Sequence, residues 1–218
     1  MTRIPDYAFR NSNNMTSAIV IPDATTYIGQ YAFYGSRSPE LTIGEGVTSI
    51  GGYAFWNCPQ LQTVHFNATN CTSMVTNSQY SVFNVGSSNG STPIVTLTIG
   101  SNVTRIPDYA FRNSSNMTCN LIIPDGVTYI GKYAFGYCSG ITGDLFFPNS
   151  ILTLGDYAFY QCRGFQGDLV IPNSVTTLGS YVFQRKKESC VSHIFLIAPH
   201  VAPHIVSFEF LLFFVFVL

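Results

Sequence analysis

Short runs in which apolar and polar residues alternate recur along the chain, and most of them close on proline or glycine. Alternation has the two-residue period of a β-strand, and proline suits the end of a strand because it has no amide hydrogen to donate. We therefore expect one very short strand in each run. The runs are Ile19–Pro22, Leu41–Gly44, Leu61–Phe66, Leu97–Gly100, Leu121–Pro124, Leu145–Pro148 and Leu169–Pro172.

The triplet Tyr-Ala-Phe lies between these runs and recurs in phase with them. Its phenylalanine position is occupied by Phe9, Phe33, Phe55, Phe83, Phe111, Phe135, Phe159 and Phe183, at spacings of 24, 22, 28, 28, 24, 24 and 24 residues. A third motif, Val-Thr-x-Ile-Gly, predicts a turn that leads into the triplet. Each repeat is thus expected to contain a strand, a turn and a short arc or single helical turn. Such a unit cannot bury its apolar face alone, so the sequence predicts a stacked solenoid of eight repeats, the first incomplete.

Two segments of the chain are close copies of each other. Residues 3–33 and 105–135 align without gaps and are identical at 23 of 31 positions. Their offset of 102 residues is the sum of four successive repeat lengths, which indicates duplication of a four-repeat block. In this alignment Met1 falls at the position of Val103, so we expect the chain to begin partway through a repeat.

The full pattern Leu-x-Ile-Pro-x-x-Val-Thr-x-Ile-Gly-x-Tyr-Ala-Phe-x-x-Cys occurs at residues 121–138 and resembles the BspA-type leucine-rich repeats. The resemblance implies an α/β-type, right-handed leucine-rich-repeat solenoid, with a parallel sheet of short strands on one face and short arcs or single helical turns opposite. It also implies a surface or secreted protein of a bacterium or microbial parasite that adheres to host proteins or other cells. The family shares no catalytic residues, so the resemblance implies no enzyme.

Strand alternation predicts which side chains of the sheet point outward. If Leu121 and Ile123 face the core, Asn120 and Ile122 face outward. The first outward row is then Ala18, Glu40, Thr63, Thr96, Asn120, Asp144 and Asp168. The second is Val20, Thr42, His65, Thr98, Ile122, Phe146 and Val170.

The second outward row contains a predicted apolar stripe of Ile122, Phe146 and Val170, which lies beside Asn120, Asp144 and Asp168 of the first row. An exposed apolar patch with a polar border is typical of a binding site. These six residues are the candidate binding face. The alternative is that aromatic and β-branched residues occur there only because they favour strands.

The two aromatic positions of the triplet receive different interpretations. The phenylalanines are expected to form the core. The tyrosines two residues earlier form a second ladder, for which we favour a packing role over recognition, although tyrosine is common at recognition surfaces.

The composition limits the kinds of partner and site that the chain is expected to have. Hydrophobic residues make up 46% of the chain and charged residues 10%, with a net charge of -1. This balance argues against a nucleic-acid partner. Three of the six cysteines, Cys58, Cys138 and Cys162, share one small-residue position of the repeat, and no Cys-x-x-Cys pair occurs. The sequence predicts free thiols and no catalytic, cofactor-binding or metal residues, and hence no cofactor.

The C-terminal segment departs from the repeat. We expect the solenoid to occupy residues 1–185 and an apolar tail outside the pattern to occupy residues 186–218. The last run, from Ile205, is 14 residues long and contains Glu209, so it is shorter than the roughly 20 residues of a membrane-spanning helix. The tail is interpreted as an artefact of the sequence, a membrane anchor or an apolar cap, and these alternatives stay open.

The function predicted from the sequence is a non-catalytic binding module that adheres to a protein of a host or of a neighbouring cell, at the cell surface or after secretion. Two alternatives remain open. One is a structural spacer or stalk, and the other is an accessory repeat fragment of a larger protein, including a larger enzyme.

Overall fold

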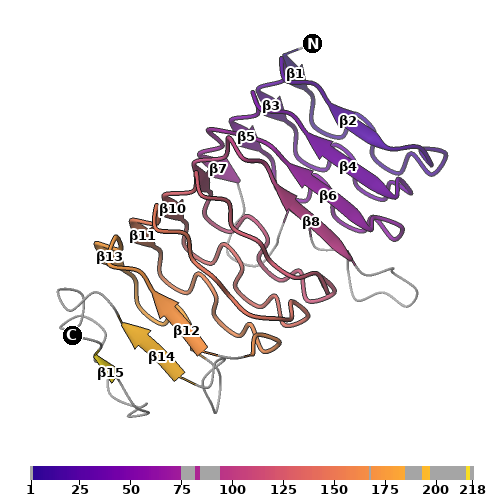
Figure 1. Ribbon diagram of the computed structural model, residues 1–218. Helices are drawn as coiled ribbons and strands as arrows, with labels where there is room; N and C mark the ends of the chain where they lie inside the picture. The colour runs from indigo at the N-terminus through magenta and orange to yellow at the C-terminus, as the bar shows by residue number, and fades with distance from the viewer. Residues whose placement is uncertain are drawn as a thin grey trace.

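The computed structural model describes residues 2–74, 82–83, 94–166 and 168–184, together with the backbone of residues 193–196 and 215–216. Within these residues the chain is a solenoid of parallel strands, and its turns stack from β1 at one end towards β13 at the other (Figure 1). The described residues include no helix. The prediction of single helical turns opposite the sheet is therefore wrong. Hydrogen-bonded turns occupy these positions.

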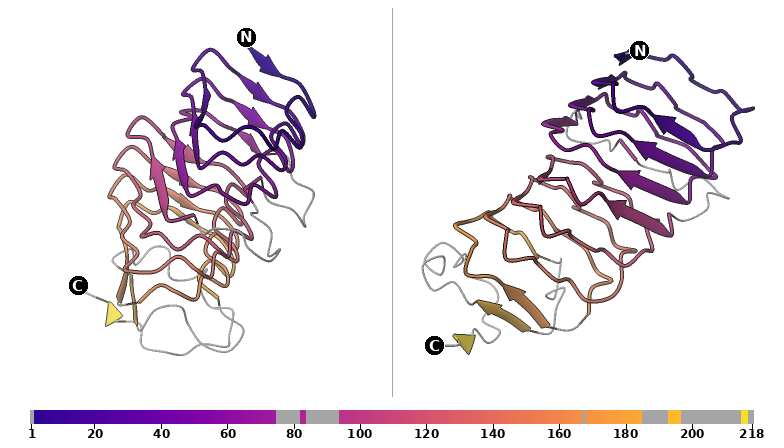
Figure 2. Two further views of the ribbon diagram at one scale, coloured as in Figure 1. Left: turned by 90° about the vertical axis from the view of Figure 1, so that its right-hand side faces the viewer. Right: turned by 45° about the horizontal axis from the view of Figure 1, so that its top comes forward.

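Four of the alternating runs form a parallel sheet in the order β2-β4-β6-β8 (Figure 2). These strands are β2 (Ile19–Ile21), β4 (Glu40–Ile43), β6 (Thr63–Phe66) and β8 (Thr96–Ile99). The register places Thr42 between Val20 and His65, and His65 next to Thr98, as the outward row predicts. Alternate side chains are buried, so each strand contributes the side chains of one face to the core.

The Val-Thr-x-Ile-Gly motif forms a second set of strands, where the sequence analysis expected only a turn. They are β1 (Arg3–Ile4), β3 (Tyr27–Ile28), β5 (Ser49–Ile50), β7 (Ser73–Met74), β9 (Arg105–Ile106), β10 (Tyr129–Ile130), β11 (Thr153–Leu154) and β13 (Thr177–Leu178). Hydroxyls of preceding threonines extend this ladder; Thr48 Oγ1, for example, donates to the carbonyl of Thr26 at 3.0 Å. The motif ends on glycine because neighbouring turns approach closely: a Cβ at Gly51 would collide with the backbone of Gln30.

Two predicted strands are missing. Residues 121–123 and 145–147 belong to no strand, and only isolated bridges connect this part of the sheet face. Gly143 has a φ of 87°, a left-handed conformation that suits glycine. Near this bend the register shifts, so that Asn120 pairs with Thr142 and not with Asp144 as predicted.

A continuous column of phenylalanine rings runs through the core. All eight repeat phenylalanines stack on their neighbours, with centroids 5.1–5.8 Å apart and planes within 18° of parallel. Phe111 and Phe135 are fully buried, whereas Phe9 at the N-terminal end is 40% exposed. The prediction of a phenylalanine core is confirmed, and each ring depends on neighbours on both sides for its burial.

The sheet face resumes at β12 (Asp168–Ile171), which pairs in parallel with β14 (His193–Leu196), and β14 pairs with β15 (Val215–Phe216). The backbone of part of the C-terminal segment therefore continues the strand stack. No helix among the described residues is long and apolar enough to cross a membrane. The other residues of the segment, including most of the run from Ile205, lie outside the described residues.

Candidate functional site

The predicted apolar stripe lies on the surface. Ile122 is 70% exposed, Phe146 is 72% exposed and Val170 is 41% exposed. The residues on either side of Ile122, Leu121 and Ile123, are buried. Inward and outward positions thus alternate as predicted at residues 121–123, even though no regular strand forms there.

The polar residues of the candidate face are only partly described. Asn120 and Asp144 are exposed, but the register shift separates them as backbone partners. Asp168 begins β12, and its side chain lies outside the described residues. The predicted polar border therefore has two described side chains, which are not direct neighbours in the ladder.

The N-terminal half of the same face has a different surface. Between Val20 and Ile122, the outward positions of the second row are held by Thr42, His65 and Thr98. His65 Nε2 lies 3.4 Å from Glu40 Oε1 on the adjacent strand, a pair that is charged only when the imidazole is protonated. Three of the four exposed apolar side chains of this row thus lie at its C-terminal end, and the fourth is Val20 at the N-terminal end.

A second surface is the tyrosine flank, for which the sequence favoured a packing role over recognition. It consists of the triplet tyrosines and the residues three positions after them. Tyr31 stacks on Tyr7 and on Tyr53, with ring centroids 5.3 Å and 4.6 Å apart. Tyr133 stacks in the same way on Tyr109 and Tyr157, at 5.7 Å and 4.6 Å.

Each described triplet tyrosine has a left-handed backbone, with φ between 53° and 61°. This conformation is unusual for a bulky residue. The triplet amides form a ladder: Tyr7 N–H donates to the carbonyl of Gln30, and Phe9 N–H donates to that of Ala32. Four residues after most of these tyrosines a second left-handed position follows, often occupied by asparagine or glycine, as at Asn11 and Gly35. Asparagine and glycine adopt this conformation most readily, so their presence at this position in the sequence indicated a tight bend.

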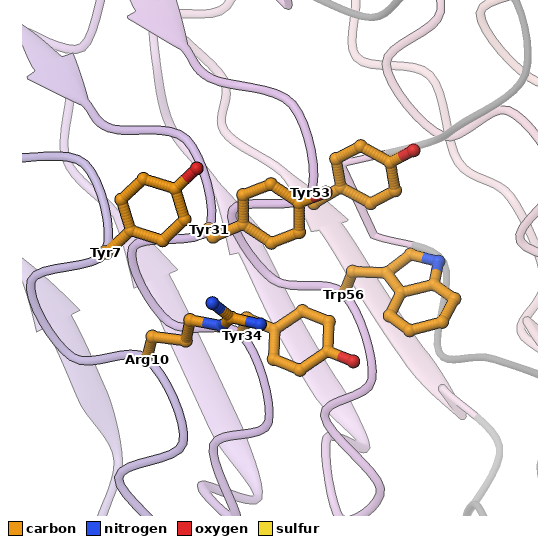
Figure 3. Close-up of a pocket in the computed structure, with 6 residues that line it drawn as sticks. All are labelled: Tyr7, Arg10, Tyr31, Tyr34, Tyr53 and Trp56. Carbon is orange, nitrogen blue, oxygen red and sulfur yellow. The ribbon is translucent and has the colours of Figure 1, made fainter.

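A hollow of about 390 Å³ lies on the N-terminal part of this flank. Figure 3 shows one row of three tyrosines and, beside it, a second row of Arg10, Tyr34 and Trp56. The complete lining is Tyr7, Arg10, Tyr31, Tyr34, Tyr53 and Trp56. The guanidinium carbon of Arg10 lies 5.4–5.7 Å from the ring centroids of Tyr7, Tyr31 and Tyr34.

The duplicated block carries the same arrangement. The guanidinium carbon of Arg112 lies 4.8–5.7 Å from the ring centroids of Tyr109, Tyr133 and Tyr137. A second hollow of about 600 Å³ lies beside it, lined by Asn113, Ser115, Tyr137, Ser139, Tyr160, Gln161 and Arg163. The sequence signal for the first hollow was an arginine or aromatic residue three positions after the tyrosine, as at Arg10, Tyr34 and Trp56. In the second hollow only Tyr160 occupies that position, and Tyr137 lies four positions after Tyr133.

The small residue three positions after each repeat phenylalanine forms a hydrogen bond to a preceding turn in several repeats. Cys58 and Cys138 are buried, and their thiols donate to the carbonyls of Phe33 and Phe111 at 3.3 and 2.9 Å. Burial raises the pKa of the Cys58 thiol to about 12 and also raises that of Cys138. Ser114 donates from the same position to the carbonyl of Phe83. The described cysteines are free thiols, as predicted.

Comparison with known proteins identifies the repeat. A family model described as BspA type Leucine rich repeat region matches in six copies, over residues 2–118 and 64–190. No curated protein sequence matches the chain.

Several solved structures resemble the chain. A leucine-rich repeat protein of T. pallidum is 21% identical over 82% of this chain and 64% of that protein, with a TM-score of 0.47. One from Bacteroides ovatus is 19% identical over 100% of this chain and 82% of that protein, with a TM-score of 0.43. A leucine rich cell surface protein from Faecalibacterium prausnitzii is 18% identical over 89% of this chain, with a TM-score of 0.36. The chain spans 64% of the length of the T. pallidum and F. prausnitzii proteins.

Proposed function

Because this chain belongs to the family of BspA-type leucine-rich repeat proteins, we propose that it is a non-catalytic module that binds another protein through its sheet face. The contact surface is the candidate binding face: Ile122, Phe146 and Val170, with Asn120, Asp144 and Asp168 beside them. The observation that carries the proposal is the high exposure of Ile122 and Phe146, 70% and 72%, on successive repeats.

Burying these side chains against a partner gives the free energy for binding. Removing apolar surface from water contributes roughly 25 cal/mol per Å², and aromatic side chains at the centre of an interface often dominate its energy. Phe146 is the most exposed of the three and is the expected anchor. The polar side chains around it would contribute to specificity more than to affinity.

Membership of the family supports a location at the cell surface or outside the cell, and a partner on a host or a neighbouring cell. Adhesion is the corresponding biological role. Neither a spacer or stalk nor an accessory segment of a longer protein needs exposed apolar side chains on its sheet face. The stripe therefore supports the binding role over both.

The test is a binding measurement with the stripe altered. The chain is passed over a panel of immobilised extracellular-matrix and plasma proteins, and equilibrium binding is recorded by surface plasmon resonance. Phe146→Asp is expected to weaken binding to a panel member by at least about tenfold, because the anchor is lost and a charge is placed in the contact.

Thr98→Asp is the matched control, because Thr98 is an exposed outward residue of the same row in its polar half. It is expected to leave binding within about twofold. Circular dichroism establishes that both variants are folded. Equal affinities of the native chain and Phe146→Asp for every panel protein would refute the assigned surface, and absence of binding to the whole panel would favour the spacer.

A further inference from the structure

The tyrosine flank presents ring edges and hydroxyls to solvent. The faces of Tyr31 are both occupied, because Tyr7 and Tyr53 stack on its two sides with planes within 8° of parallel. An aromatic ring carries partial negative charge on its faces and partial positive charge at its edge. Stacking therefore covers the negative faces, and the remaining surface is a series of positive edges and phenolic hydroxyl groups. Such a surface favours ligands rich in acceptor oxygens.

Positive charge lies along the same flank. The guanidinium carbon of Arg10 lies 5.4–5.7 Å from three tyrosine ring centroids in the first hollow, and Arg10 forms no ion pair with any described carboxylate. Arg112 is held over three rings in the duplicated block, and Arg163 lines the second hollow. The ring contacts restrict the two caged guanidinium groups, which reduces the entropy lost when each of them binds an oxyanion.

The carboxylates next to the ladder are engaged elsewhere. Asp6 precedes Tyr7, and its Oδ1 accepts hydrogen bonds from the backbone of Gln30 and the hydroxyl of Tyr27, at 2.8 and 3.1 Å. Asp108 makes the equivalent two bonds, to the backbone of Lys132 and the hydroxyl of Tyr129, both at 2.9 Å. Both acidic groups thus bond to the neighbouring turn and to the β3 and β10 strands, where donors partly compensate their charge.

The geometry of the flank is linear. The two caged arginines are four repeats apart, which corresponds to roughly 20 Å at the usual strand spacing. The hollows have volumes of about 390 and 600 Å³, a size typical of sites for small ligands or for a few sugar residues. An extended polymer with an oxyanion at regular intervals is able to contact both arginines, and its linked binding events reinforce each other.

We propose that the tyrosine flank binds an acidic polysaccharide that lies along the solenoid axis, with Arg10 and Arg112 contacting its carboxylate or sulfate groups and the tyrosine hydroxyls donating to its sugar oxygens. The occupant is assigned from charge and hydrogen-bond donors, because two guanidinium groups four repeats apart and a row of tyrosine hydroxyls match a polymer of oxyanions and sugar oxygens. The proposed site is separate from the candidate binding face and does not depend on the protein-binding function.

The test uses three fluorescently labelled polymers, namely dextran sulfate, polygalacturonate and neutral dextran, titrated with the full chain at physiological ionic strength. Fluorescence anisotropy is expected to show saturable binding of at least one acidic polymer and none of neutral dextran. The two acidic polymers distinguish sulfate from carboxylate as the recognised group. Arg10→Gln and Arg112→Gln are each expected to weaken binding about tenfold, and the double variant about a hundredfold, since each loses one charge-assisted contact.

The structure offers matched controls. Arg3 and Arg105 are also held over tyrosine rings, with guanidinium carbons 4.1 and 4.5 Å from the centroids of Tyr27 and Tyr129, but they lie on β1 and β9 outside the flank. Arg3→Gln and Arg105→Gln remove the same charge and are expected to change affinity by less than about twofold. A weaker effect is expected for Tyr31→Phe, which removes a hydroxyl and keeps the stacked ring.

Three results would overturn the proposal. The first is no saturable binding of either acidic polymer. The second is an equal loss of affinity in Arg10→Gln and Arg3→Gln, because that would indicate a general dependence on net charge. The third is binding to vesicles that contain phosphatidylserine but to neither acidic polymer, which would assign the flank to a lipid surface.

Discussion

The two copies of the duplicated segment have almost the same sequence and different surroundings. Residues 3–33 are at the N-terminal end of the described stack, and residues 105–135 are in its interior. Phe9 is 40% exposed, whereas its counterpart Phe111 is fully buried. The difference shows that a repeat acquires its core from the turns on both sides of it.

Local structure also differs between the copies. Ile19–Ile21 forms strand β2 and pairs with β4, whereas residues 121–123 form no strand. Both segments alternate buried and exposed side chains, so the hydrophobic pattern is satisfied in each. In the second copy only isolated bridges connect the neighbouring turns, and the following turn has a left-handed residue at Gly143 and a shifted register.

The largest expected effect comes from shortening the core ring in each copy. Phe111→Ala should lower the free energy of unfolding by roughly 3–5 kcal/mol, because it leaves a cavity between two stacked rings. Phe9→Ala should cost only about 1–2 kcal/mol, because Phe9 is 40% exposed and has a ring on one side only.

Urea denaturation followed by circular dichroism measures both variants. Equal losses of stability in Phe111→Ala and Phe9→Ala would contradict the view that burial depends on neighbouring turns on both sides.

The buried thiols predict an alkaline limit to stability. Burial raises the pKa of Cys58 from 9.0 to about 12. The folded state therefore retains this proton between about pH 9 and pH 12, where the unfolded thiol ionises. Stability from the neutral thiol is complete below pH 9 and falls as the pH rises towards 12, by up to about 1.4 kcal/mol per pH unit.

Unfolding by urea at pH 8, 9 and 10 tests this expectation. Cys58→Ser should make the dependence shallower, because the serine hydroxyl donates as the thiol does and does not titrate in this range, while buried Cys138 still contributes. A slope that is unchanged in Cys58→Ser would assign the alkaline loss to other groups.

The smallest effect is expected at the serine that is shared by the two copies. Ser114 donates to the carbonyl of Phe83 in the preceding turn, at 3.5 Å. Its counterpart Ser12 is in the first turn of the described stack, and the described residues include no carbonyl of an earlier turn for it to bond. Ser114→Ala should therefore cost about 0.5–1.5 kcal/mol and Ser12→Ala close to nothing. Thermal unfolding of both variants checks the prediction, and a larger loss for Ser12→Ala would contradict it.

The sequence predicted the features that follow from strict repetition. Phe135 and Leu121 are buried and Ile122 is exposed because hydrophobic spacing alone determines which side of a turn they occupy. Of the expected short arcs or single helical turns, the helical turns do not occur among the described residues. The left-handed backbone at Tyr133 and Tyr137 is incompatible with a helical turn, and tyrosine gives no local signal for that conformation.

The register shift and the arginine cages of the tyrosine flank were not predicted, for different reasons. Asn120 pairs with Thr142 next to the left-handed Gly143, and a repeat pattern specifies neither feature. The cage around Arg10 depends on rings from two turns of the solenoid, so it becomes visible only when the turns are stacked. Asp144 was expected beside Asn120 because each directly precedes the first apolar residue of its run.

The comparison between the two copies also gives the most direct test of the proposed binding face. Val20 and Ile122 are equivalent positions with exposures of 66% and 70%, but Ile122 is in the apolar half of the outward row and Val20 is in the polar half. Binding of Val20→Asp and Ile122→Asp to the panel protein is measured by surface plasmon resonance. We predict that Ile122→Asp loses at least about tenfold in affinity and that Val20→Asp binds as the native chain does. Equal affinities of the two variants would contradict the assignment of the binding face.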